Sequence, residues 1–289
     1  MSSMVNIIKM DLFRLMKARG TYITLAFVAV ITCMLFMMSI SFGEAAEAEA
    51  LEEGNVMWRE VNDEEIDAIK GGDGLGFYMP DFTRDSKIPF ETLINGFLSS
   101  GVFLVFVGIF ATNTVCNQYN CGFQKNLSIY SRKKWQLVMA QNIVILVFST
   151  VEILLTALTV LLLSRCYLHH FTWGDIGSIV RYMGIHILMH YAFGIFVMCL
   201  VELIRGKVAG ITLTCLLSLG FGTVFFSKLD ELLKLKKFSV TEHTLVYHVK
   251  LLPISYDSQL WGRAAMVAIG AILLYNVVCT LVVSRRDMA

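Results

Sequence analysis

Residues 136–163 read QLVMAQNIVILVFSTVEILLTALTVLLL and contain a single charged residue, Glu152. A helix rises about 1.5 Å per residue, so a stretch of this length can cross the roughly 30 Å hydrocarbon core of a bilayer. Uncharged apolar runs of this length are typical of transmembrane segments. We therefore predict a membrane-spanning helix over residues 136–163.

Similar apolar stretches recur on both sides of this helix. The chain is 56% hydrophobic and 16% charged, whereas soluble domains are about 25% charged. The composition and the recurring stretches predict an all-α fold, a six-transmembrane-helix bundle in a cell membrane. The predicted spans are residues 21–43, 92–116, 136–163, 182–202, 208–227 and 264–284.

Residues 1–20 precede the first span and are predicted to form an amphipathic helix at the membrane interface. Lys9, Arg14 and Lys17 lie mainly off its apolar face and can meet anionic headgroups. The apolar run that follows is too long for a cleavable signal peptide, so we expect it to persist as the first span. The apolar positions at helical spacing are Met4, Val5, Ile8, Leu12, Leu15 and Met16.

Residues 44–91 form the longest polar stretch, with fourteen Asp and Glu against four Lys and Arg. We predict that this acidic segment is extracellular, together with a connector over residues 228–263. The short segments on the other side are rich in Lys and Arg, and an even number of spans places both termini in the cytoplasm. Five lysines within the 228–263 connector oppose this orientation.

The sequence lacks the common motifs of catalysis and nucleotide binding. No Walker motif, HExxH, GxSxG or EF-hand loop occurs. The seven cysteines are scattered without CxxC spacing, which is typical of small buried apolar residues. A net charge of +1 gives no case for nucleic acid. We expect no catalytic site and no cofactor or metal bound by this chain.

Residues 117–135 form a short basic segment between the second and third spans. Gly122 interrupts it, and Ser131, Arg132 and Lys133 come shortly before the third span. On charge alone the segment is an ordinary cytoplasmic topology signal. It is equally compatible with a short coupling helix that docks on a partner protein.

Four pieces of the chain carry a resemblance to a known family: residues 6–23, residues 122–134, residues 252–256 and residues 284–287. They read NIIKMDLFRLMKARGTYI, GFQKNLSIYSRKK, LPISY and SRRD. This layout resembles the permease subunits of ABC-2 type exporters, especially those of Gram-positive bacteria. The long acidic segment departs from the short first outer loop of many such permeases.

The resemblance implies a transmembrane subunit that works with a separate ABC ATPase, which would bind ATP and Mg. It implies two copies of that ATPase, a second permease subunit that is identical or related, and contact with membrane lipids. It also implies export of an amphipathic substrate, such as a lipid-like molecule or an antimicrobial peptide whose removal gives resistance. The ATPase-coupling surface would contain Gly122, Lys125, Asn126, Ser131, Arg132 and Lys133.

A second candidate site is intramembrane. His186 and His190 share a helix face at i, i+4 spacing, and His190 lies at a depth similar to that of Glu152. Because an isolated charge is costly there, we predict that Glu152 and His190 pair and that His186 has a lesser part. The cluster could form a structural hydrogen bond, a substrate or proton path, or a metal site.

Two rival functions remain open at this point. One is a membrane-embedded metal-dependent hydrolase that uses Glu152, His186 and His190. The other is a non-transporting sensor or assembly subunit, with the acidic segment as its receptor surface.

Overall fold

The computed structural model describes residues 2–52, 82–120, 135–233, 239–255 and 257–285. Within these ranges every regular element is a helix, and the backbone adds one isolated bridge between Pro89 and Thr172. Five helices are long and apolar enough to cross a membrane, and one bent pair makes a sixth candidate span. The predicted all-α bundle of about six spans is confirmed.

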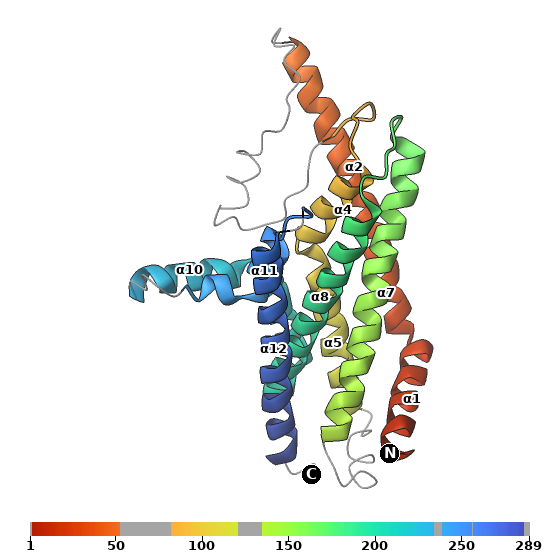
Figure 1. Cartoon of the computed structure of the whole chain (residues 1–289). Helices are drawn as coiled ribbons and strands as arrows, with labels where there is room; N and C mark the ends of the chain where they lie inside the picture. The colour runs from red at the N-terminus through yellow and green to blue at the C-terminus, as the bar shows by residue number, and fades with distance from the viewer. Residues whose placement is uncertain (1, 53–81, 121–134, 234–238, 256, 286–289) are drawn as a thin grey trace.

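The long helices pack side by side along one axis, and α1 and the end of α12 lie at the same end of the bundle (Figure 1). We call this the termini end. The long helices are α2 (Arg19–Glu52), α5 (Val102–Asn120), α7 (Trp135–Tyr167), α8 (Ile176–Ile204) and α12 (Ser258–Arg285).

Helix α8 forms the centre of the bundle and contacts α5, α7, α9 and α12. Its apolar residues are spread around the helix, which is the pattern expected of a buried helix. Asp175 caps its first turn, because the carboxylate accepts hydrogen bonds from the backbone amides of Gly177 and Ser178. The hydrogen bond from the Ser178 hydroxyl, together with those from the two amides, lowers the pKa of Asp175.

Two glycines allow the central helices to approach closely. A methyl group added at Gly108 of α5 would lie 2.1 Å from Thr214 Cγ2 of α9 (Lys207–Ser218). One added at Gly194 of α8 would lie 2.5 Å from Ile145 Cγ2 of α7. Small residues at such contacts let helix backbones pack tightly within a membrane.

The region of the second predicted span contains a break. Two residues separate the end of helix α4 (Phe90–Ser99) from the start of α5, and one of them, Gly101, has a φ of 75°. Glycine adopts this left-handed conformation without steric cost. The sequence predicted one helix over residues 92–116, whereas the structure has two helices joined at Ser100 and Gly101.

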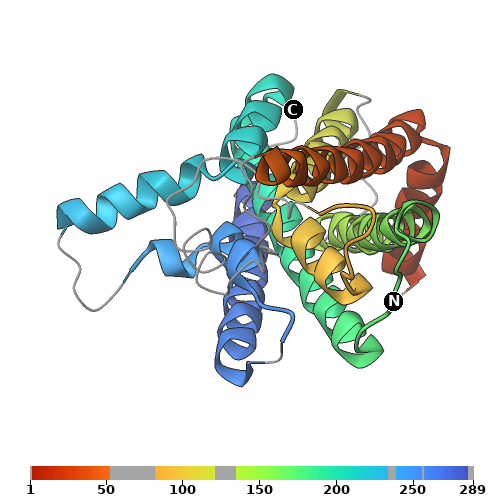
Figure 2. The same ribbon diagram turned by 90° about the horizontal axis from the view of Figure 1, so that it is seen from above.

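The region of the fifth predicted span bends by 66° between α9 and α10 (Phe221–Leu233), next to Gly220 with a φ of 94°. Helix α10 leaves the bundle sideways (Figure 2). The chain returns through η1 (Thr241–His243) and α11 (Leu245–Leu251). Asp230 Oδ2 accepts hydrogen bonds from the Ser239 hydroxyl and the Thr241 amide, which ties η1 to α10.

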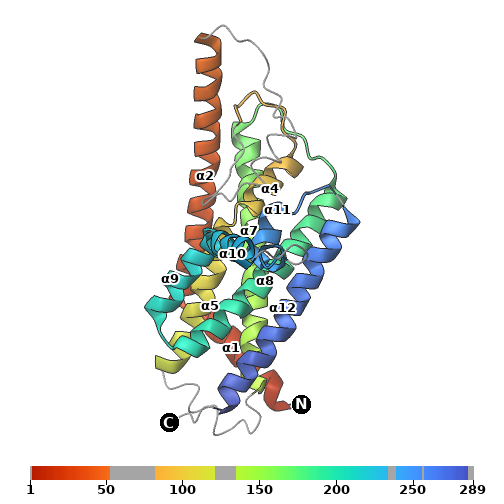
Figure 3. The same cartoon turned by 90° about the vertical axis from the view of Figure 1, so that its left-hand side faces the viewer.

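Helix α1 (Ser2–Lys17) packs against the start of α7, where Ile7 contacts Leu137 and Ala140. Helix α2 continues past the predicted end of the first span and projects beyond its neighbours (Figure 3). The first residues of the predicted acidic segment are therefore helical, because EAAEAEALE has a high helix propensity. The part of that segment at residues 53–81 lies outside the described residues.

Candidate functional site

Glu152 and His190 face each other across the contact between α7 and α8. Nδ1 of His190 lies 3.4 Å from Oε2 of Glu152, and both side chains are completely buried. Two polar side chains from different helices thus meet inside the bundle. A carboxyl and an imidazole in this arrangement can share one proton, which avoids an isolated charge in the membrane.

His186 lies one turn before His190 and extends the polar cluster. Its ring centroid is 4.4 Å from that of Tyr182 and 6.1 Å from that of His190. The Tyr182 hydroxyl donates a hydrogen bond of 2.7 Å to Oδ1 of Asn95 on α4. Both nitrogens of the His186 ring are buried without a hydrogen-bond partner among the described residues.

The same face of α7 carries two further buried hydroxyls, Ser149 and Thr156, one turn on either side of Glu152. Neither hydroxyl has a hydrogen-bond partner within the described ranges. We call Ser149, Glu152, Thr156, His186 and His190 the polar seam. It places several hydrogen-bonding groups between α7 and α8 in an otherwise apolar core.

The polar seam does not have the geometry of a metal site. In the part of the chain that the structure describes, no three His, Cys, Asp or Glu side chains lie together in a way that could hold a metal ion. The 3.4 Å between His190 and Glu152 instead makes a long hydrogen bond between two helices. The metal-dependent hydrolase therefore gains no support from the arrangement of Glu152, His186 and His190.

A second set of polar contacts lies at the termini end and was not predicted from the sequence. The Tyr119 hydroxyl on α5 donates a hydrogen bond to the buried carboxylate of Glu202 on α8. The Arg205 guanidinium lies 5.2 Å from the centroid of the Tyr119 ring. The amide of Gln141 on α7 donates a hydrogen bond to Gln118 on α5. Glu202 is the last residue of the fourth predicted span, 182–202.

These contacts fix both sides of the predicted coupling segment. Helix α5 ends at Asn120 and α7 begins at Trp135, so Tyr119 and Gln141 hold the ends from which the segment departs. The sequence signal that could have predicted these contacts is the presence of polar residues, Gln118, Tyr119 and Gln141, at the ends of two apolar runs. The predicted coupling residues, Gly122, Lys125, Asn126, Ser131, Arg132 and Lys133, lie outside the described residues.

The predicted interfacial cations lie on α1. Lys9 and Lys17 are exposed, and the Lys17 ammonium lies 4.6 Å from the centroid of the Phe13 ring. Arg14 lies 3.6 Å from the carboxylate of Asp11, which is buried against the bundle. Burial raises the pKa of Asp11 to about 6, although the positive charge of Arg14 opposes this shift.

Part of the chain matches a known protein family. Residues 80–221, just under half of the chain, match the family described as ABC-2 family transporter protein. This match supports an ABC-2 type permease. A search of curated proteins found no match to the chain. The match supports the role of a transport permease, and the family implies association with an ABC ATPase.

The matched range covers most of the candidate site. It includes the polar seam, the Tyr119–Glu202 contact and both ends of the predicted coupling segment. Helix α1 precedes the range, and α11 and α12 follow it. The resemblance that the sequence carries at residues 122–134 therefore falls inside the region that defines the family.

Proposed function

We propose that this permease is the membrane-spanning subunit through which an ABC exporter moves an amphipathic substrate, such as an antimicrobial peptide or a lipid-like molecule. A separate ATPase, present in two copies, supplies the energy. A second permease subunit, identical or related, completes the path. The substrate class rests on the family resemblance. The side of the membrane on which the ATPase would dock rests on the charges of the termini end.

The observation that carries the proposal is the charge of the termini end. The two carboxylates described there, Asp11 and Glu202, are both buried. The positive-inside rule then favours a cytoplasmic termini end, where an ATPase has access. The exposed cations of α1 and of the helix ends on this side are Lys9, Lys17, Arg205, Lys207 and Arg285.

The coupling segment provides the test. A docking surface needs particular side chains at fixed positions, whereas a topology signal needs only positive charge. Shuffling residues 120–133 at constant composition, with Lys134 kept, should preserve abundance and membrane insertion. The same change should abolish co-purification of the ATPase, or leave ATP hydrolysis uncoupled from transport. Affinity purification in mild detergent with identification of the bound chains measures the association.

A shuffle of residues 44–52 is the matched control, because it reorders a helical stretch at the other end of the bundle. This variant should retain the ATPase. Salt should weaken the wild-type association, since exposed ion pairs are screened over about 8–10 Å. Normal ATPase binding and transport by the 120–133 shuffle would reduce the segment to a topology signal. Failure of the wild-type chain to retain any ATPase would favour a non-transporting sensor or assembly subunit.

A further inference from the structure

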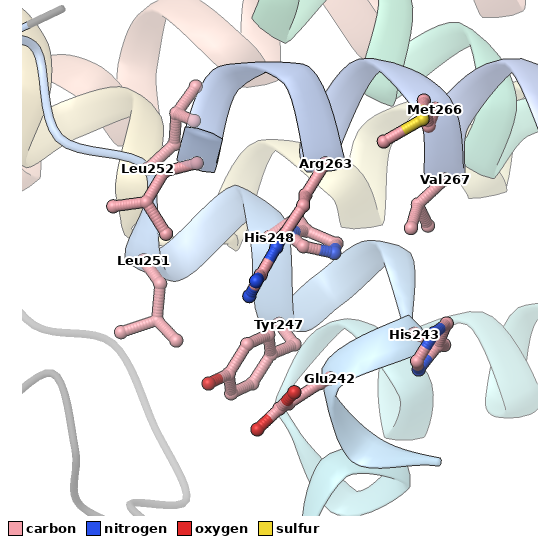
Figure 4. Close-up of a pocket in the computed structure, with 10 residues that line it drawn as sticks. Glu242, His243, Tyr247, His248, Leu251, Leu252, Arg263, Met266 and Val267 are labelled. Atoms are coloured by element: carbon pink, nitrogen blue, oxygen red, sulfur yellow. The ribbon is translucent and has the colours of Figure 1, made fainter. Parts of the chain in front are cut away.

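A pocket of about 590 Å³ opens between η1, α11 and the first turns of α12 (Figure 4). It lies beyond the range matched by the permease family and apart from the polar seam. Glu242, His243, Tyr247, His248 and Arg263 contribute its polar lining. Its apolar lining includes Leu251 and Met266.

Two side chains of opposite charge line this pocket and do not form an ion pair with each other. Glu242 and Arg263 are both exposed, and within the described ranges neither side chain takes part in an ion pair. The aromatic ring of Tyr247 lies in the pocket between them (Figure 4). A positive and a negative group that are separated in one pocket match a ligand that carries both charges itself.

His248 adds a nearly buried polar group to the pocket lining. Its side chain is only 9% exposed, and its Nε2 atom has no hydrogen-bond partner in the described part of the chain. Burial lowers the pKa of His248, and a hydrogen bond to the backbone of Glu242 opposes that shift. A buried nitrogen without a partner is costly, so a polar ligand group at this position would be stabilising.

The position of Arg263 along α12 places the pocket at headgroup depth. Arg263 and Arg285 lie 22 residues apart on α12, and residues 264–284 between them contain no charge. At about 1.5 Å per residue this separation is about 33 Å, close to the hydrocarbon thickness of a bilayer. If Arg285 is at one headgroup layer, Arg263 is at the other.

An apolar track leads from the pocket toward the middle of α12. Met266, Ile269 and Leu273 follow at helical spacing, and their side chains are 67%, 50% and 64% exposed. They present a continuous apolar surface to the surrounding lipid. An acyl chain can therefore lie against this face while its headgroup occupies the pocket.

We propose that this pocket binds one phospholipid with a zwitterionic headgroup that carries a primary ammonium. Arg263 binds the phosphate, because a guanidinium fits phosphate oxygens with two parallel hydrogen bonds. Glu242 binds the ammonium, and the face of Tyr247 adds a cation–π contact. The acyl chains lie along Met266, Ile269 and Leu273. This site is independent of the substrate that the permease transports.

Native mass spectrometry of the full-length protein with defined lipids tests the assignment. We expect retention of phosphatidylethanolamine in preference to phosphatidylglycerol, which lacks the ammonium. Arg263→Gln and Glu242→Gln should each reduce phosphatidylethanolamine retention about three- to tenfold, as expected for loss of one partly exposed charge-assisted hydrogen bond. Arg181→Gln is the matched control, because Arg181 is an exposed arginine near the start of α8 that pairs with Asp175. It should leave retention unchanged.

The double variant Glu242→Arg/Arg263→Glu keeps the charge of the pocket but reverses its polarity, and it should also lose phosphatidylethanolamine. The melting temperature of each variant separates loss of the lipid from loss of the fold. Equal retention of phosphatidylglycerol, insensitive to Glu242→Gln, would show an anionic lipid site and overturn the assigned headgroup. Full retention by the folded Arg263→Gln or double variant would overturn the pocket as the binding site.

Discussion

Several polar side chains inside the bundle form hydrogen bonds with side chains on neighbouring helices. Asn142 on α7 donates a hydrogen bond to Asn276 on α12, and Tyr182 on α8 donates one to Asn95 on α4. Lipid cannot satisfy such groups, so each pair fixes how two helices meet. Glu152 belongs to this set, because its carboxyl group faces the imidazole of His190 rather than lipid.

Mutation of the Glu152–His190 pair should show coupling. We expect Glu152→Ala and His190→Ala to destabilise the protein non-additively, with an interaction energy of about 0.5–2 kcal/mol, because each replacement removes the same hydrogen bond. Thermal unfolding of the two single variants and the double variant in one detergent completes the cycle.

The matched control combines Glu152→Ala with His186→Ala. The His186 ring has no hydrogen bond to Glu152, so the effects of these two replacements should add within about 0.5 kcal/mol. Strict additivity of Glu152→Ala and His190→Ala would show that these two side chains do not interact. Stoichiometric zinc in washed protein would restore the metal interpretation.

The sequence identified some of these polar residues but not their partners. Glu152 and His190 were visible because charge is rare in an apolar run. Asn142 and Asn276 are 134 positions apart, and their pairing depends on how α7 and α12 rotate against each other. Helix rotation is set by side-chain packing, so local sequence does not determine it.

At the scale of elements, glycines decide both where helices break and where they touch. Gly101 and Gly220 take positive φ values at breaks, whereas Gly108 and Gly194 lie inside helices at close contacts. Apolar run length predicted the helical regions well, because a span needs about 20 apolar residues. It could not distinguish a breaking glycine from a packing glycine, since both interrupt an apolar run in the same way.

The contact between α5 and α9 can be tested at Gly108. Gly108→Ala places a methyl group 2.1 Å from Thr214 Cγ2, and Thr214 is buried with its hydroxyl bonded to the Gly210 carbonyl at 2.8 Å. The helices must therefore separate or Thr214 must change rotamer. We expect a loss of about 1–3 kcal/mol of stability, measured as a lower melting temperature in detergent.

Gly270→Ala on α12 is the control, because a methyl group there would meet no atom within 4 Å. It should be neutral or stabilise by up to about 1 kcal/mol, since alanine favours the helix. Adding Thr214→Ala to Gly108→Ala should recover part of the lost stability. Equal stability of Gly108→Ala and wild type would show that α5 and α9 are not held at this distance.

At the scale of the whole molecule, the path of the chain fixes the relation between the two ends. Helix α8 runs toward the termini end, α9 turns back, and α12 returns to that end after the sideways excursion of α10 (Figures 1 and 3). The beginning of α1 and the end of α12 are therefore on one side, whether the α9–α10 pair is counted as a full span or not. The side that faces the cytoplasm follows from charge and is open to direct measurement.

Cysteine labelling of intact cells can establish this orientation, because the chain supplies a natural reporter. Cys166 is exposed near the end of α7, opposite the termini, whereas the other described cysteines lie within helices of the candidate spans. With Cys121 replaced by serine, a membrane-impermeant maleimide should label Cys166 from outside, and Cys166→Ser should remove the signal.

A cysteine introduced at Lys9 or at Ser284 should react only after the cells are permeabilised. Both introduced sites must respond alike, because the fold puts them on the same side. Labelling of Lys9→Cys in intact cells, with protection of Cys166, would show the opposite orientation. The basic termini end would then be outside, where no ATPase could reach it.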